Sequence, residues 1–93
     1  MGYKLADHEP YVITGKQGKE YVIPASIDLN LDGVEIVLRF DKEEDEVERA
    51  KICKEFLLHF APELEAEDIS DMEYFMIFKD YNKAKTKNKL GES

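Results

Sequence analysis

Apolar and polar residues alternate on both sides of Asp32-Gly33, over residues 25–40. An Asp-Gly pair between two alternating segments is typical of a two-residue β-turn. Because successive side chains of a strand point to opposite faces, such a turn would gather eight apolar side chains on one face of a ribbon. The cross-strand pairs would be Ala25 with Phe40, Ile27 with Leu38, Leu29 with Ile36, and Leu31 with Val34. We therefore expect a β-hairpin here, with an apolar face that other elements must cover.

A second hairpin is expected upstream. Residues 11–14 have the composition of a strand, the polar loop at 15–18 contains two glycines that suit a turn, and an apolar run resumes after Glu20. Pro24 cannot donate a hydrogen bond to a strand ladder, so it disrupts the second strand locally. The pattern predicts a three-stranded antiparallel meander, with strands at about 11–14, 20–31 and 34–40.

After residue 40 the periodicity becomes helical. Apolar residues recur every three or four positions from Val47 to Phe60, and Pro62 ends this helix. Ser70-Asp-Met-Glu73 is a capping box, which favours a helix over the competing interpretation of a buried strand at 72–78. We predict helices at about 42–60 and 71–86 that cover the sheet, and hence an α+β fold.

The length of 93 residues is enough for a single domain with one core. Residues 1–10 show no periodicity, and the chain ends in a lysine-rich segment. We expect residues 1–10 and 87–93 to be flexible, the latter as a disordered C-terminal tail.

Charge is distributed unevenly along the chain. The formal net charge is -8. Residues 41–73 hold thirteen acids against four bases, whereas residues 79–93 hold five lysines against two acids. A strongly acidic protein repels polyanions, so a nucleic acid is not expected as a partner. The acidic middle and basic end are either solvated surfaces or interaction surfaces.

Candidate chemistry is sparse. Asp28-Leu-Asn30-Leu-Asp32-Gly33 resembles the first half of a calcium loop, but Arg39 stands where the bidentate glutamate belongs. Cys53 and His59 are six residues apart and would lie on different faces of the predicted helix. The chain has no nucleophile-elbow, phosphate-loop or dinucleotide-binding motif. We therefore expect no metal, no cofactor and no enzymatic activity.

The cellular setting follows from a few absences in the sequence. A single cysteine allows no intrachain disulfide, which is typical of a reducing compartment. No apolar run approaches the roughly 20 residues that span a bilayer, and the first residues do not form a signal peptide. We expect a cytoplasmic protein with no membrane partner.

Residues 74–78 (Tyr-Phe-Met-Ile-Phe), which we call the apolar belt, are apolar on every side of the predicted helix. Such a helix is buried on several faces, or one face meets another molecule. The candidate partner-binding residues are Leu57, Phe60, Tyr74, Phe75, Phe78 and Tyr81. Two alternatives stay open: packing of these residues on the hairpin, and homo-oligomerisation through the belt.

Four segments carry a resemblance to a known family. They are Lys19–Ala25 (KEYVIPA), Phe56–Leu64 (FLLHFAPEL), Asp71–Tyr74 (DMEY) and Leu90–Ser93 (LGES). In this order they resemble the tail assembly chaperones of long-tailed bacteriophages that infect Gram-positive hosts. The resemblance implies a small, acidic, non-enzymatic protein that binds the tape-measure protein and shields its apolar helices until the tail tube polymerises.

Two other functions stay open. The acidic segment that begins at residue 41 would suit a DNA mimic that inhibits a nucleic-acid-binding enzyme. Alternatively, the chain is a structural subunit of a phage tail or connector, which would remain in the virion, whereas a chaperone departs.

Overall fold

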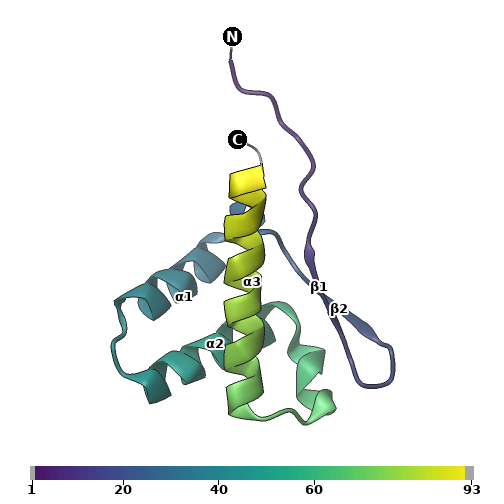
Figure 1. Cartoon of the computed structure of the whole chain (residues 1–93), viewed down its shortest axis with the longest axis vertical. Helices are drawn as coiled ribbons and strands as arrows, with labels where there is room; N and C mark the ends of the chain where they lie inside the picture. The colour runs from purple at the N-terminus through teal and green to yellow at the C-terminus, as the bar shows by residue number, and fades with distance from the viewer. Residues whose placement is uncertain (1, 92–93) are drawn as a thin grey trace.

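The computed structural model describes the backbone of residues 2–91 and the side chains of residues 2–84 (Figure 1). Its elements are β1 (Tyr11–Thr14), β2 (Glu20–Ile23), the short 3-10 helix η1 (Ser26–Asp28), α1 (Leu31–Lys42), α2 (Glu46–Phe60), the 3-10 segment η2 (Pro62–Glu67) and α3 (Asp71–Gly91). The predicted α+β class is confirmed. The predicted three-stranded meander is wrong, because the described residues form one two-stranded sheet and a helix takes the place of the third strand.

The predicted upstream hairpin, formed by residues 11–14 and the strand that begins at Glu20, is confirmed. β1 and β2 pair antiparallel, with Tyr11 opposite Ile23 and Thr14 opposite Glu20. Gly18 has a φ of 90°, a conformation that favours glycine, and its N–H donates to the carbonyl of Gly15 at 3.0 Å. The strand ends at Ile23, directly before Pro24, rather than at residue 31. The proline therefore ends the strand instead of interrupting it.

The predicted hairpin around Asp32-Gly33 is wrong. Residues 31–42 form α1, and the side chain of Asn30 caps it by accepting a hydrogen bond from Gly33 N at 2.8 Å. The alternating apolar positions fit a helix as well as a hairpin, but they divide between two faces. Ile36 and Phe40 point into the core, whereas Leu31 and Leu38 remain exposed. Asp32-Gly33 lies in the first turn of a helix, not in a β-turn.

Gly33 has a packing role in this helix. A Cβ atom at this position would lie 2.6 Å from Cζ of Phe60, on the neighbouring helix α2. The missing side chain therefore lets α1 and α2 pack closely. The glycine that suggests a turn in the sequence is needed for helix contact in the structure.

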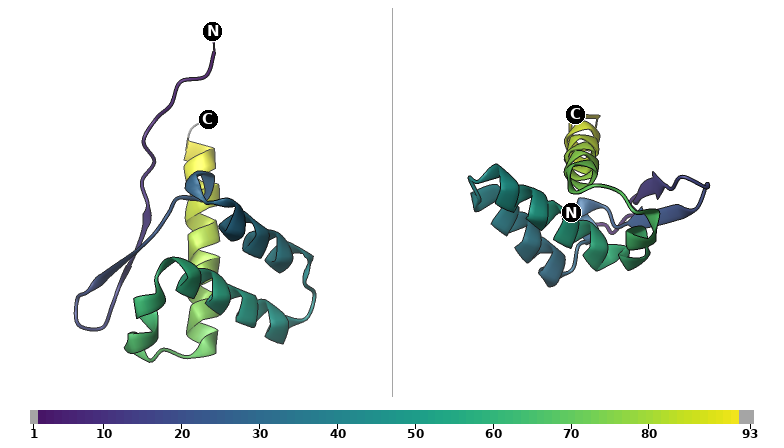
Figure 2. Two further views of the ribbon diagram at one scale, coloured as in Figure 1. Left: turned by 180° about the vertical axis from the view of Figure 1, so that it is seen from behind. Right: turned by 90° about the horizontal axis from the view of Figure 1, so that it is seen from below.

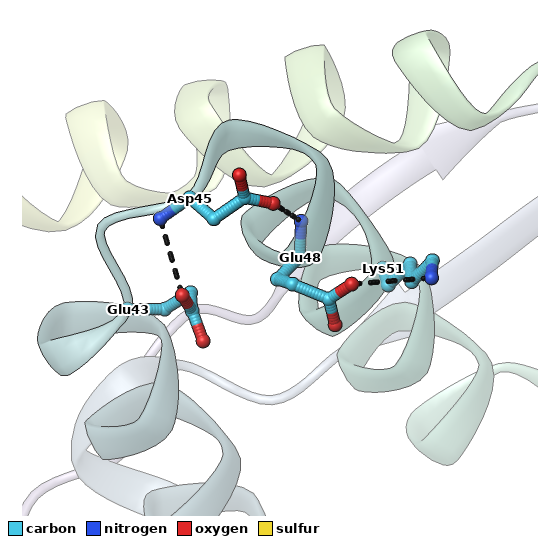
Figure 3. A network of polar contacts seen from close by, with 4 residues as sticks. All are labelled: Glu43, Asp45, Glu48 and Lys51. Atoms are coloured by element: carbon cyan, nitrogen blue, oxygen red, sulfur yellow. Dashed lines mark hydrogen bonds and ion pairs between the residues drawn. The ribbon is translucent and has the colours of Figure 1, made fainter.

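The helix α2 ends at Phe60 as predicted but begins at Glu46, four residues later than expected. Figure 3 shows the reason: the Asp45 carboxylate accepts a hydrogen bond from Glu48 N at 3.0 Å and so caps the helix. Glu43 Oε2 in turn accepts from Asp45 N at 3.1 Å, and Glu48 pairs with Lys51 at 3.2 Å. Part of the acidic segment thus organises the connection between α1 and α2.

The predicted start of α3 is confirmed. Ser70 Oγ accepts a hydrogen bond from Glu73 N at 3.1 Å, and the helix begins at Asp71. The alternative of a strand at 72–78 is excluded. The helix continues to Gly91, beyond the predicted end at residue 86, so residues 87–91 of the predicted disordered tail lie in helical backbone. Residues 92–93 of that tail lie outside the described residues, and residues 2–10 have no regular secondary structure.

The core forms around α2, which contacts α1, α3, β2 and η2. Figure 2 shows α1 and α2 as an antiparallel pair, with α3 crossing one side of it. At the centre, the ring of Phe78 lies 4.8 Å from that of Phe40 and 5.0 Å from that of Phe56, centroid to centroid. Edge contacts of this kind add to the area that the rings bury.

Candidate binding groove

Four of the six candidate partner-binding residues lie in the core. Leu57 and Phe78 are 0% exposed, and Tyr74 and Tyr81 are 1% and 3% exposed. Tyr81 also donates a hydrogen bond from its hydroxyl to the carbonyl of Pro24 at 2.8 Å. In this structure these four side chains stabilise the fold, and a partner would reach them only if α3 moved.

The other two candidates, Phe60 and Phe75, are partly buried. The ring of Phe60 lies 5.2 Å from that of Phe56 and covers Gly33. Phe75 lies on α3, where it packs partly against the core. Nζ of Lys79 lies 5.5 Å from the centroid of its ring. The apolar belt is therefore divided: Tyr74 and Phe78 face the core, while Phe75 and Met76 leave surface open.

A groove of about 750 Å³ opens beside Phe75. The end of α1, the first turn of α2 and the middle of α3 form its walls. Its lining residues are Phe40, Glu46, Arg49, Phe75, Met76, Lys79, Asp80, Asn82 and Lys83. The groove is open to solvent, so a ligand could enter it without displacing an element.

The floor of the groove is apolar. Phe40 is 5% exposed, and Phe75 is partly open. Met76 is 57% exposed and gives the groove a flexible, polarisable wall. An open apolar floor of this kind is typical of sites that take side chains of a partner.

Arg49 is the main polar group of the groove. Its guanidinium carbon lies 4.1 Å from the ring centroid of Phe40, a cation–π distance. Its Nε is buried and makes no hydrogen bond with any described residue. A buried donor without a partner is costly, and because this Nε has no open surface, a carboxylate in the groove could bond to it only after the Arg49 side chain moved.

The charge of the groove differs from that of the protein. Arg49, Lys79 and Lys83 stand against Glu46 and Asp80, three positive charges against two negative. Asp80 is already engaged, since its carboxylate accepts a hydrogen bond from the hydroxyl of Tyr11 at 2.6 Å. On a chain of net charge -8, the groove is a local region where an anionic group is attracted.

The remaining perturbed groups have structural roles. Burial raises the pKa of the Cys53 thiol to about 12, against a smaller opposite effect of Arg49, so the thiol stays protonated and inert. The Tyr21 hydroxyl donates to Glu67 at 2.6 Å, and this hydrogen bond is the main cause that raises the pKa of Tyr21 to about 12. The same bond is the main cause that lowers the pKa of Glu67. None of these three groups lines the groove.

The described residues contain neither a metal-binding cluster nor a membrane-spanning helix. No three His, Cys, Asp or Glu side chains lie together there in a way that could hold an ion. Of the partial calcium motif, Asp28 pairs with His8 at 3.3 Å and Asn30 caps α1. In the same part of the chain, no helix has the length and apolar content to cross a bilayer.

No protein-family model, no curated protein and no solved structure matches this chain. Of the nine described groove residues, the sequence predicted Phe75 as a binding residue and Met76 as part of the apolar belt, and it missed the other seven, among them Phe40, Arg49 and Lys79. One signal was available: Arg49 directly follows a run of acids and is one of only two arginines in the chain. Its place beside Phe40 depends on α1, which the sequence pattern assigned to a strand.

Proposed function

We propose that this chain is a non-enzymatic protein-binding module of the tail assembly chaperone type, which holds an apolar helix of a tape-measure protein in its groove. The observation that carries the proposal is the open apolar floor beside the positively charged Arg49. This combination selects an amphipathic segment with an acidic side chain next to its apolar residues. A helix is the usual form in which such a segment enters a groove.

The chemistry of the groove suits temporary binding. Phe75 and Met76 offer apolar contact, and the methionine can adapt to different side chains. The volume accommodates a few side chains rather than a whole helix, so the affinity per copy is modest. A chaperone needs this property, because it must release the tape-measure protein when the tube forms.

The resemblance of the segments around Tyr21, Phe56, Asp71 and Gly91 to tail assembly chaperones supports the same function. The acidic surface around the groove would keep a complex with an apolar partner dispersed. We propose that the protein acts in the cytoplasm of the bacterial host. A free, buried Cys53 is typical of such a reducing compartment.

The test is recovery of the tape-measure protein from phage-infected cells with the tagged chain as bait. Met76→Glu places a negative charge in the groove, whereas Met72→Glu makes the same change one turn earlier on α3, outside the groove. Met76 and Met72 are similarly exposed, at 57% and 63%, so neither change should unfold the chain. We expect the wild type and Met72→Glu to recover the tape-measure protein, and Met76→Glu, which repels the acidic side chain of the partner, to lose most of it. Recovery that is equal for all three baits would refute the groove as the site.

The location of the protein after assembly separates a chaperone from a structural subunit. A chaperone is present in infected cells and absent from purified virions, because it leaves before the tail is complete. A tail or connector subunit would be found in the particles at a fixed copy number per virion.

A DNA-mimicking inhibitor is the second candidate, because the acids at the start of α2 are exposed. Several of them have structural partners, as Figure 3 shows for Glu43, Asp45 and Glu48. A mimic should lose salt-sensitive inhibition of its enzyme when Glu44 and Glu48, which are exposed and lie outside the groove, are changed to glutamine. The chaperone proposal expects this double variant to bind its partner as the wild type does.

A further inference from the structure

The helix α1 has an apolar face that no other element of the described chain covers. Leu31 is 85% exposed, Val34 37% and Leu38 51%. At about 100° per residue, these three side chains fall within an arc of about 60°. They lie opposite Ile36 and Phe40, which face the core. We call these three residues the α1 stripe.

Charged residues border one side of the stripe in a simple order. Asp32 lies beside its N-terminal end, Glu35 beside its middle, and Arg39 and Lys42 beside its C-terminal end. All four are exposed. Two acids and two bases make this border neutral, although the chain as a whole carries a charge of -8. Two copies of the chain can therefore meet here without the repulsion that acts between their acidic surfaces.

We propose that the α1 stripe binds the α1 stripe of a second copy of this chain, with the two helices antiparallel. In this arrangement Leu31 of each copy contacts Leu38 of the other, and Val34 lies near the two-fold axis. Asp32 of each copy faces Arg39 of the other. On the opposite border, the side chain of Asn30 faces Asp41 of the second copy, as an amide donor to a carboxylate.

The order of charges decides both the occupant and the orientation. A parallel pair would place Asp32 on Asp32 and Arg39 on Arg39, which is unfavourable. An antiparallel pair places Asp32 of each copy on Arg39 of the other, as a self-complementary two-fold interface requires, and only the two exposed Glu35 side chains face a like charge, near the two-fold axis. Arg39 already pairs with Glu55 of α2, but a guanidinium has five N–H donors and can hold two carboxylates.

The interface is independent of the proposed groove. The stripe and the core-facing side of α1, which contributes Phe40 to the groove, are on opposite sides of the helix. A dimer would thus leave both grooves open. With three apolar side chains per copy, the contact is smaller than a standard stable interface, so we expect a dissociation constant on the order of 100 μM.

Sedimentation equilibrium of the full chain over a range of concentrations tests the dimer. We expect the weight-average mass to rise from monomer towards dimer. Leu38→Glu should weaken association at least about tenfold. Val47→Glu, a matched change at an exposed apolar residue of α2 that is 63% exposed, should leave association unchanged. A wild type that stays monomeric throughout, leaving the stripe for another protein or for solvent, would overturn the proposal, as would equal effects of the two variants.

A charge exchange tests the orientation. Asp32→Arg and Arg39→Asp should each weaken association, because each places like charges opposite one another in an antiparallel pair. The double variant restores opposite charges and should associate within about threefold of the wild type. Circular dichroism of each variant checks that the helices are intact. If the double variant associates no better than the single ones, the antiparallel pairing is wrong. None of these outcomes depends on whether the groove binds a tape-measure protein.

Discussion

The three helices and the β1–β2 hairpin are held in place by different forces. The helices pack through apolar rings, with Phe78 between Phe40 and Phe56. The hairpin buries Tyr21 and Ile23, but its further anchors are tyrosine hydroxyls that bond to distant parts of the chain. These anchors are Tyr11 to Asp80, Tyr21 to Glu67 and Tyr81 to Pro24. Changes in the helices should therefore unfold the whole domain, whereas changes at the anchors should loosen the hairpin and depend on pH.

The largest effect is expected for Phe78→Ala, in the middle of the helical core. Phe78 is 0% exposed, and truncation of a buried phenylalanine costs about 3 to 5 kcal/mol of the free energy of unfolding. Met76→Ala, two residues away on the exposed side of α3, should cost less than about 0.5 kcal/mol. Urea unfolding followed by circular dichroism measures both. Similar losses for the two variants would mean that α3 does not divide into a core side and a groove side.

Gly33→Ala tests the contact between α1 and α2. Overpacking against the ring of Phe60 costs about 1 to 3 kcal/mol, partly offset by about 1 kcal/mol gained in helix propensity. We expect a net loss of about 1 kcal/mol in the same urea experiment. In a Phe60→Leu background the clash is relieved, so Gly33→Ala should become neutral or stabilising. The same sign in both backgrounds would show that the ring does not limit residue 33.

Tyr81→Phe removes one anchor of the hairpin and keeps the ring in the core. Loss of the hydrogen bond to the carbonyl of Pro24 should cost about 1 kcal/mol. Amide exchange should accelerate more in β2 than in α2, since the bond holds the end of this strand. Tyr3→Phe, at a tyrosine that is 81% exposed, is the control and should change neither quantity. Uniform acceleration over all elements would contradict a separately anchored hairpin.

Glu67→Gln tests the smallest and most pH-dependent effect. The carboxylate accepts from the Tyr21 hydroxyl and from Lys16 N at 3.0 Å, and these hydrogen bonds lower its pKa below the ordinary value of 4.5. A lowered folded pKa means that the stabilisation is present above pH 4.5 and is lost as the pH falls through the folded pKa. Gln offers one acceptor oxygen in place of two, so one bond is lost at every pH.

Thermal melts between about pH 3 and about pH 7 measure this difference. The wild type should melt at a higher temperature than Glu67→Gln at neutral pH, and the two curves should converge towards the acid end. A difference that is constant over the whole range would exclude Glu67 as a titrating anchor. At the alkaline end, the raised pKa of Tyr21, about 12, means that the stabilisation from its hydroxyl is fully present below its ordinary value of 10.0 and is lost as the pH rises through the folded value.

The sequence alone determined those features that depend on neighbouring residues. The β1–β2 hairpin, the cap at Ser70 and the end of α2 before Pro62 were all predicted from residues a few positions apart, and the structure confirms them. Steric and hydrogen-bonding rules act within a turn of chain, so the signals for these features are complete in the local sequence.

Tertiary packing decided the state of residues 25–42 and the division of the apolar belt. Alternation around Asp32-Gly33 fits a hairpin with one apolar face or a helix with two. The choice came from the contact of Gly33 with Phe60 and from the burial of Ile36 and Phe40, which involve residues far away in the chain. Likewise, a belt that is apolar all round has no intrinsic inner side. Phe78 became core and Phe75 became groove because α2 covers only one side of α3, a fact of packing that no local pattern encodes.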